Sequence, residues 1–297
     1  MKLYSKQFLG LEAELTSFEK AAVVLVPFPY EGGVSYGLGT VRAPDAILDA
    51  SCYLELYDEV LDDQPYRIGL TTVNPPKIAN NPEDMIQTIY ETTLFFLNQD
   101  KFVILIGGDH SITFGYYKAI REKYGQVSVI QIDAHADLRN TYEGSPWSHA
   151  CVMSRIREST THTLQIGIRS LSAKEAALVK KENISLCTMH QFRQGHFDLE
   201  AALNLLPDPV FLTVDADVFD WSVIMSTGTP EPGGLLWDEG VSLLQNIFMK
   251  KNVIGFDFVE LSYQENDRNS PYAAAKMIYK MIGFKFFNNK NITDLEL

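Results

Sequence analysis

The sequence contains few cysteines, no long apolar run and fewer basic than acidic residues. Its 297 residues include only three cysteines, Cys52, Cys151 and Cys187, which form no disulfide framework. No apolar stretch reaches the roughly 18 residues that a membrane-spanning helix needs. With 25 Lys and Arg against 38 Asp and Glu, the net charge is −13. Nucleic acids and anionic lipids require a basic face, so the charge argues against either as the main partner.

The amino-terminal residues also lack the apolar segment that is typical of a secretory signal. Together with the small number of cysteines, this predicts a reducing, cytoplasmic setting and no membrane partner. Domains with α/β folds often reach this length, and the chain shows neither an internal repeat nor a convincing linker. We therefore expect residues 1–297 to form a single domain.

Short apolar runs alternate with helical patterns along most of the chain. The strand-like runs lie at residues 22–27, 67–70, 102–106, 127–132, 163–168, 184–187, 210–214 and 253–258. Helical patterns lie at 45–57, from 82 to 97, between Ser111 and Gly125, and at 172–181, 238–250 and 271–282, the last ending before Gly283. This alternation predicts an α/β fold with a parallel sheet and helices on both faces. We expect residues 288–297 to fray.

Three short clusters of His and Asp follow three of the apolar runs. They contain six potential metal ligands, namely His110, Asp133, His135, Asp137, Asp215 and Asp217. Two imidazoles and four carboxylates are too many for one small cation and about right for two. A set rich in carboxylates suits hard or borderline divalent cations such as Mn²⁺. Because a metal pair can generate hydroxide and stabilise developing charge, the clusters indicate a dinuclear hydrolase.

The spacing within the clusters supports a shared site. Side chains two residues apart on a strand point to the same face, so Asp133, His135 and Asp137 converge if their strand continues past its end. The same holds for Asp215 and Asp217. Open α/β sheets bind ligands beyond the carboxyl ends of their strands, where all three clusters lie. One such motif alone is more often a turn or a helix cap, but three complementary motifs at three strand ends favour a metal site.

Two further side chains could act on a substrate. His149 lies in loop-like sequence and could carry protons near neutral pH, although a structural histidine is the alternative. Glu260 follows the last apolar run, where its carboxylate could pair with a planar guanidinium or simply begin a helix. The glycine- and proline-rich run at 226–234, which includes Thr229, could form a rigid substrate wall or an ordinary surface connection.

Together these motifs resemble those of the ureohydrolases, the arginase–agmatinase superfamily, and within it most resemble the agmatinases. The resemblance runs from about Pro27 to Gly283. It includes GGVSYGLGT at 32–40, GGDHS at 107–111, DAHAD at 133–137, His149, DAD at 215–217, TGTPEPGG at 227–234 and DFVE at 257–260. Trp221 stands where the family often has proline, at a position that is not expected to bind metal.

The resemblance implies a three-layer α/β/α fold with a mostly parallel eight-stranded sheet and a single ureohydrolase domain, commonly assembled as a trimer or hexamer. It implies two Mn²⁺ per subunit, the first held by His110, Asp133, Asp137 and Asp215 and the second by His135, Asp133, Asp215 and Asp217. A hydroxide bridging the metals would attack a guanidinium carbon and release urea. His149 would then be the proton shuttle, Glu260 the guanidinium carboxylate, and Asp137 would steady the tetrahedral intermediate.

The family divides by the tail of its small-molecule guanidine substrate. Arginases grip an amino-acid carboxylate with Asn and Ser side chains in the loop that corresponds to 139–148. Here Glu143, Tyr142 and Trp147 suit an ammonium group, by Coulomb attraction and cation–π contact. The loop therefore favours agmatine, hydrolysed to putrescine and urea in polyamine biosynthesis. Arg139 and Asn140 leave arginine open, and aminopropylagmatine or another guanidine is also open.

A metal-binding but catalytically silent homologue, acting as a regulator, is the alternative outside the enzymes. The complete ligand set and the presence of both His149 and Glu260 argue against it.

Overall fold

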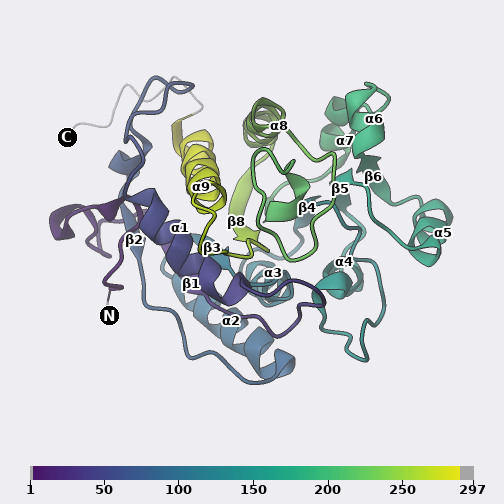
Figure 1. Ribbon diagram of the computed structural model, residues 1–297, viewed down its shortest axis with the longest axis horizontal. Coiled ribbons are helices and arrows are strands. Elements are labelled where there is room, and N and C mark those ends of the chain that lie inside the picture. Colours follow the sequence, from purple (N-terminus) through teal and green to yellow (C-terminus); the bar gives the residue numbers. More distant parts are fainter. Residues whose placement is uncertain (1–2, 288–297) are drawn as a thin grey trace.

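The computed structural model of the chain describes residues 3–287. Its centre is an eight-stranded sheet in the order β2-β1-β3-β8-β7-β4-β5-β6, and every neighbouring pair is parallel (Figure 1). The strands are β1 (Val23–Phe28), β2 (Leu70–Thr72), β3 (Phe102–Gly107), β4 (Ser128–Ile132), β5 (Thr163–Ile168), β6 (Ser185–Thr188), β7 (Val210–Asp215) and β8 (Val253–Val259).

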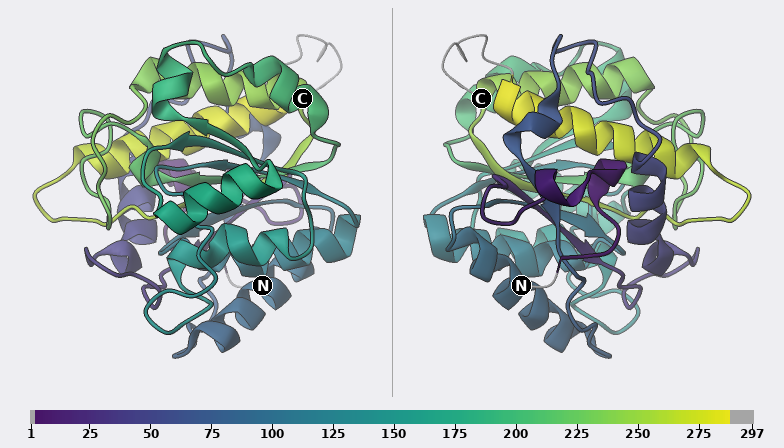
Figure 2. Two further views of the ribbon diagram at one scale, coloured as in Figure 1. Left: turned by 90° about the vertical axis from the view of Figure 1, so that its right-hand side faces the viewer. Right: turned by 90° about the vertical axis from the view of Figure 1, so that its left-hand side faces the viewer.

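Helices cover both faces of this sheet (Figure 2). One face packs against α1 (Ala43–Ser51), α6 (Met189–Arg193), α7 (Leu199–Leu205), α8 (Trp237–Lys250) and α9 (Asn269–Phe287). The other packs against α2 (Pro82–Leu97), α3 (Ile112–Tyr124), α4 (Val152–Arg157) and α5 (Ala173–Glu182). The predicted three-layer α/β/α arrangement is thus confirmed, and the sheet is parallel throughout.

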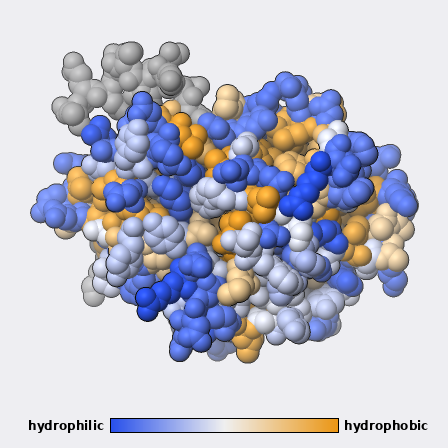
Figure 3. All heavy atoms as spheres, turned by 45° about the horizontal axis from the view of Figure 1, so that its top comes forward, coloured by the Kyte–Doolittle hydropathy of each residue, from blue (hydrophilic) through white to orange (hydrophobic). Residues whose placement is uncertain are grey.

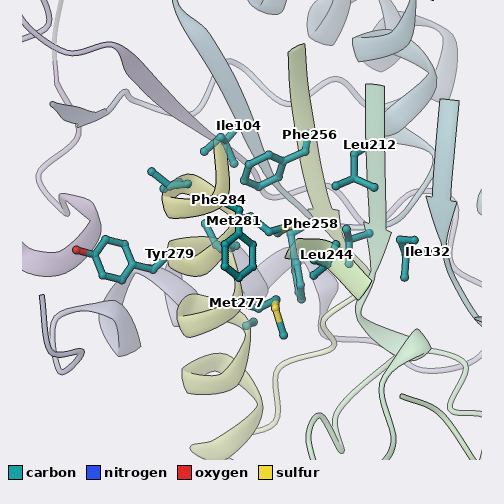
Figure 4. Packing of buried hydrophobic residues seen from close by; sticks show 14 of the residues in the cluster. Ile104, Ile132, Leu212, Leu244, Phe256, Phe258, Met277, Tyr279, Met281 and Phe284 are labelled. Carbon is teal, nitrogen blue, oxygen red and sulfur yellow. The ribbon is translucent and has the colours of Figure 1, made fainter. Parts of the chain in front are cut away.

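The sheet is buried because its strands are apolar on both sides. Every residue of β1, β3, β4, β5 and β7 is buried. On the α9 side, Phe256 and Phe258 of β8 pack with Met277 and Phe284 of the helix (Figure 4). Parallel strands covered on both faces require such continuous apolar runs, which is why the sequence pattern revealed them.

Four adjacent strands bring the predicted site together. In the order β3-β8-β7-β4, their carboxyl ends lead into His110, Glu260, Asp215 and Asp133 respectively. The neighbouring strands β7 and β4 lead to opposite sides of the sheet, β7 to β8 and β4 to β5, so the direction of the connections reverses between them. Open α/β sheets form their ligand crevice at such a reversal.

Several boundaries differ from the prediction. β2 begins at Leu70 and not at residue 67, because Pro65–Ile68 forms a 3-10 turn and Gly69 has a positive φ of 83°. α1 stops at Ser51, where the predicted helix ran to residue 57. Ser111 precedes α3 as predicted, but its hydroxyl donates to Asp109 and does not cap the helix. The predicted fraying at 288–297 lies outside the described residues.

The surface of the described chain is largely polar. On the face in Figure 3, hydrophilic residues predominate and apolar ones form separate patches. Large exposed apolar side chains include Tyr36, Leu38, Tyr53, Leu205 and Met249. Among residues 3–287 no helix combines the length and the apolar character needed to span a bilayer.

Candidate metal centre

Three carboxylates surround one imidazole nitrogen at the carboxyl edge of the sheet. His110 Nδ1 lies 3.2 Å from Asp133 Oδ2, 3.2 Å from Asp137 Oδ2 and 3.2 Å from Asp215 Oδ2. All four side chains are buried, and within residues 3–287 Nδ1 has no hydrogen-bond partner that satisfies the usual geometry. A buried nitrogen equidistant from three carboxylate oxygens is the donor arrangement that a small cation requires.

A second group of donors adjoins the first. His135 Nδ1 lies 2.8 Å from Asp217 Oδ2 and 3.7 Å from Asp133 Oδ1. Asp133 therefore turns one oxygen toward each histidine and belongs to both candidate metal-binding groups. Asp215 faces His110 through Oδ2, while its Oδ1 accepts the Asp217 N–H at 2.8 Å. The structure thus brings all six predicted ligands together, in two groups that share Asp133.

The electrostatics of these groups also fit cations. Burial and the charge of Asp133 raise the pKa of Asp137 to about 6. Burial and the charges of Asp217 and Asp133 raise the pKa of Asp215 well above its usual value. Burial would lower the pKa of His110, but its contacts with the three carboxylates raise it strongly. Without a cation these acids repel one another, and divalent ions would relieve that repulsion.

Polar side chains inside the strands hold the donors, and sequence reasoning missed them. Gln131 donates to Asp133 Oδ2 at 2.6 Å, and His110 Nε2 lies 2.8 Å from Thr213 Oγ1. Thr213 pairs in register with Asp257, a fully buried acid on β8. Gln131 and Thr213 each stand two residues before a ligand in an apolar strand, so they face the same side. Each is a polar residue inside an otherwise apolar strand, and that pattern could have identified them from the sequence.

Glu260 and His149 lie beside the metal-binding groups. Glu260 Oε1 accepts the His110 backbone N–H at 2.8 Å and lies 3.3 Å from His149 Nδ1. The contact with Glu260 outweighs burial and raises the pKa of His149 to about 9. Glu260 is itself buried, and its Oε2 has no partner among the described residues. This free carboxylate oxygen is available to a cationic group of a ligand.

The 139–148 loop lies partly at the site and partly away from it. The ring of Tyr142 is 6.4 Å from that of His149, and the Arg139 guanidinium covers it at 4.9 Å. Glu143 is exposed, at the tip of the turn closed by Tyr142 and Ser145. The Trp147 ring stacks on Phe114, and its N–H donates to Glu83 at 3.0 Å. Tyr142 is thus the loop's ring contact to His149, while Trp147 joins the loop to α2 and α3.

The glycine- and proline-rich loop at 226–234 lies beside the group of donors around His135. Thr229 Oγ1 lies 3.4 Å from Asp217 Oδ2, and Glu231 Oε1 lies 3.9 Å from His135 Nε2. Arg169 holds this loop, because its guanidinium donates to the backbone oxygens of Glu231 at 2.9 Å and Pro232 at 3.0 Å. The same guanidinium reaches the Asp217 carbonyl at 2.6 Å, so one residue joins the loop to a ligand segment.

Comparisons with known proteins agree with this geometry. A model of the arginase family matches residues 21–283. An N(1)-aminopropylagmatine ureohydrolase of Synechocystis sp. is 39% identical over 287 residues, which cover 94% of each chain. An agmatinase of Pyrococcus horikoshii is 32% identical over 286 residues, 95% of this chain and 99% of its own. The crystal structure of the agmatine ureohydrolase of Thermoplasma volcanium superposes with a TM-score of 0.84 at 27% identity, covering 95% of this chain and 94% of that one.

The family match spans most of the chain, and relatives above 30% identity align along nearly all of it. The chain therefore belongs to the arginase family, as a metal-dependent ureohydrolase of the agmatinase and aminopropylagmatine type.

Proposed function

We propose that this enzyme releases urea from N(1)-aminopropylagmatine, a guanidine whose tail carries two further amines. The observation that carries the reaction class is the buried ligand set beside the unpartnered Oε2 of Glu260. The choice of tail is supported by the relatives named for that substrate, which share 34–39% identity with this chain, against 31–32% for those named agmatinase. The residues of the 139–148 loop alone favoured agmatine, which differs only by lacking the aminopropyl group.

Each residue of the site has a proposed role. His110, Asp133, Asp137 and Asp215 would hold one Mn²⁺, and His135, Asp133, Asp215 and Asp217 the other. When bound, the two ions would supply Lewis acidity and lower the pKa of a water molecule. Glu260 orients the guanidinium through Oε2, since a carboxylate pairs well with that planar cation. Asp137 would steady the charge that develops on the substrate, and His149 would protonate the amine that leaves.

The surroundings of the site suit a tail with more than one positive charge. Glu231 lies beside His135 with its side chain 33% exposed, and Glu143 is exposed on the neighbouring loop. Tyr142 offers a ring next to His149, and Thr229 a hydroxyl next to Asp217. Ammonium groups are attracted both to such carboxylates and to aromatic faces. The substrate role of Trp147 stays a prediction.

The test is a comparison of urea release from N(1)-aminopropylagmatine, agmatine and arginine by one Mn²⁺-loaded preparation. We expect the highest kcat/KM with N(1)-aminopropylagmatine, measurable activity with agmatine and the lowest with arginine, whose carboxylate meets an acidic entrance. Agmatine above aminopropylagmatine would support an agmatinase instead. Binding of guanidines without urea release from any of them would indicate a silent homologue.

Assembly is a separate proposal. We propose that the chain forms a homo-oligomer, a trimer or a hexamer, which would cover apolar side chains such as Tyr53 and Leu205, now 81% and 82% exposed. Light scattering on the purified protein measures the mass directly, and a monomer at working concentration would contradict the proposal.

A further inference from the structure

A loop between β1 and α1 is attached to three segments around the site. We call residues 31–41 the strap. Its Gly33 N–H donates to Asp109 Oδ2 at 2.7 Å, next to the ligand His110. Its Gly37 N–H donates to the Gly228 carbonyl at 2.9 Å, in the 226–234 loop. Its Leu38 carbonyl accepts from the hydroxyl of Ser262, two residues after Glu260, at 2.7 Å. The strap is therefore fixed to the turns that present the site.

Glycines allow the strap to approach these turns closely. A Cβ atom at Gly33 would lie 3.1 Å from Asp109 Oδ1 and 3.2 Å from the His149 backbone nitrogen. A Cβ atom at Gly37 would lie 2.8 Å from the Gly228 carbonyl oxygen. In contrast, the strap gains little from apolar burial, since Tyr36 is 81% exposed. Polar contacts therefore determine its position.

These contacts place the side chain of Ser35 next to His149. Ser35 Oγ lies 3.0 Å from His149 Nε2, on the side of the ring away from Glu260. The other ring nitrogen, Nδ1, faces Glu260 Oε1 at 3.3 Å. A ring held at only one nitrogen can still swing about its side-chain bonds, but a ring with a partner on both is fixed in orientation.

We propose that Ser35 is a positioning residue that holds the His149 ring at Nε2 while Glu260 holds it at Nδ1. The proposal rests on the proposed function, in which His149 protonates the departing amine. A hydroxyl can both donate and accept, so Ser35 remains a partner whether Nε2 carries its proton or has given it up. The other ionisable groups near His149 are the carboxyls of Glu260, Asp137 and Asp109. The Tyr142 ring also lies beside the imidazole. Ser35 is the neutral partner on the opposite side of the ring.

The test removes the hydroxyl without detaching the strap, since none of the strap's backbone anchors involves it. We expect Ser35→Ala to lower kcat about 10- to 100-fold, less than the ~10²–10⁴-fold expected when a general acid is lost. KM and the two bound metals should change little, and Ser35→Thr should recover most of the rate. In chelated, metal-free protein labelled with ¹⁵N-histidine, where no paramagnetic Mn²⁺ broadens the signals, the Nε2 signal of His149, assigned from His149→Asn, should shift in Ser35→Ala without substrate.

Gly33→Ala is the second variant, because its Cβ should displace the strap while the Ser35 hydroxyl is kept. It should move the same His149 signal. Ser222→Ala, at an exposed turn serine, is the matched control and should alter neither rate nor signal. An unmoved Nε2 signal, a kcat within twofold of wild type, or lost metal in Ser35→Ala would each overturn the proposal. A wild-type enzyme that releases no urea would instead refute the proposed function, and the NMR signal would still decide the role of Ser35.

Discussion

At the scale of single residues, Asp133 is the side chain on which both metal-binding groups depend. Its Oδ2 faces His110 and its Oδ1 faces His135, whereas Asp217 forms its histidine contact with His135. We expect Asp133→Asn to lose both Mn²⁺ after dialysis and Asp217→Asn to lose mainly one, because an amide carries no charge to bind a cation. Metal analysis of the dialysed proteins measures this. Two tightly held ions in Asp133→Asn would show that the ligand assignment is wrong.

Thr213 contacts a proposed metal ligand and is not itself proposed to bind metal. Its Oγ1 is the partner of His110 Nε2, and such outer contacts fix which nitrogen faces the metal. Thr213→Val should weaken Mn²⁺ affinity at the His110 group about 10- to 100-fold. Competition with a metal-binding dye measures the affinity. Thr93→Val is the control, since Thr93 is equally buried but its Oγ1 has no partner in the described chain; equal losses in both variants would argue against the role.

At the scale of elements, the strands and long helices could be predicted because their burial pattern is local. All eight strands form at the predicted apolar runs, with β2 displaced along the chain. The end of α9 could not be predicted, because Gly283 was expected to follow the helix. It lies inside it, where a Cβ would come within 2.3 Å of Leu61 and 3.0 Å of Pro65. A glycine that allows close packing and one that ends a helix look alike in sequence.

The same limit applied to the site. The ligands could be predicted from spacing, since they follow directly from strand ends. Ser35 and Arg169 could not be assigned roles. The His149 partner of Ser35, and every carbonyl that Arg169 reaches except that of Gly167, lie more than 40 residues away along the chain. Long-range contacts of loops leave no periodic pattern.

The turn after β3 depends on a glycine. A Cβ at Gly108 would lie only 1.8 Å from the Tyr30 carbonyl oxygen, which leaves no room for alanine without moving the backbone. Gly108→Ala should therefore lower the thermal midpoint far more than Gly125→Ala. At Gly125 the backbone, with φ 79° and ψ −124°, would strain an alanine by about 1–3 kcal/mol, but no described atom lies within 4 Å of the added carbon. Calorimetry of both variants tests this, and similar midpoints would contradict it.

Arg169 joins two elements through the fork of its guanidinium. It reaches five backbone carbonyls, those of Gly167, Asp217, Val218, Glu231 and Pro232. A lysine ammonium cannot reproduce this planar set of donors. We expect Arg169→Lys to loosen the 226–234 loop and raise KM at least several-fold, with a smaller effect on bound metal. Arg157→Lys, away from that loop, is the control; an equal KM change in both would exclude a specific role for Arg169.

At the scale of the whole molecule, the acidic site links stability to pH and to metal. Burial, with the charge of Asp133, raises the pKa of Asp137 to about 6, and burial raises that of Asp257 to about 6, from ~3.9 in an unfolded chain. A carboxyl whose pKa is raised by folding binds its proton more tightly in the folded state. Its contribution to stability is complete below pH ~4 and is lost as the pH rises to about 6. The chelated protein should therefore carry its largest internal repulsion above pH 6.

Mn²⁺ should reverse that loss, because it binds the deprotonated ligands. We expect Mn²⁺ to raise the thermal midpoint more at pH 7.5 than at pH 5, since at pH 5 protons compete for Asp137. A ligand at 100 times its Kd stabilises a fold by about 2.7 kcal/mol, so the difference is measurable by calorimetry with and without chelator. The thermal midpoints with and without Mn²⁺ are compared at the same pH. Groups whose pKa is shifted the other way, such as Glu260, therefore contribute equally to both midpoints unless they respond to the metal. Asp133→Asn should show a small increment at both pH values, and an equal increment at pH 5 and 7.5 in the wild type would mean that the buried acids do not govern metal binding.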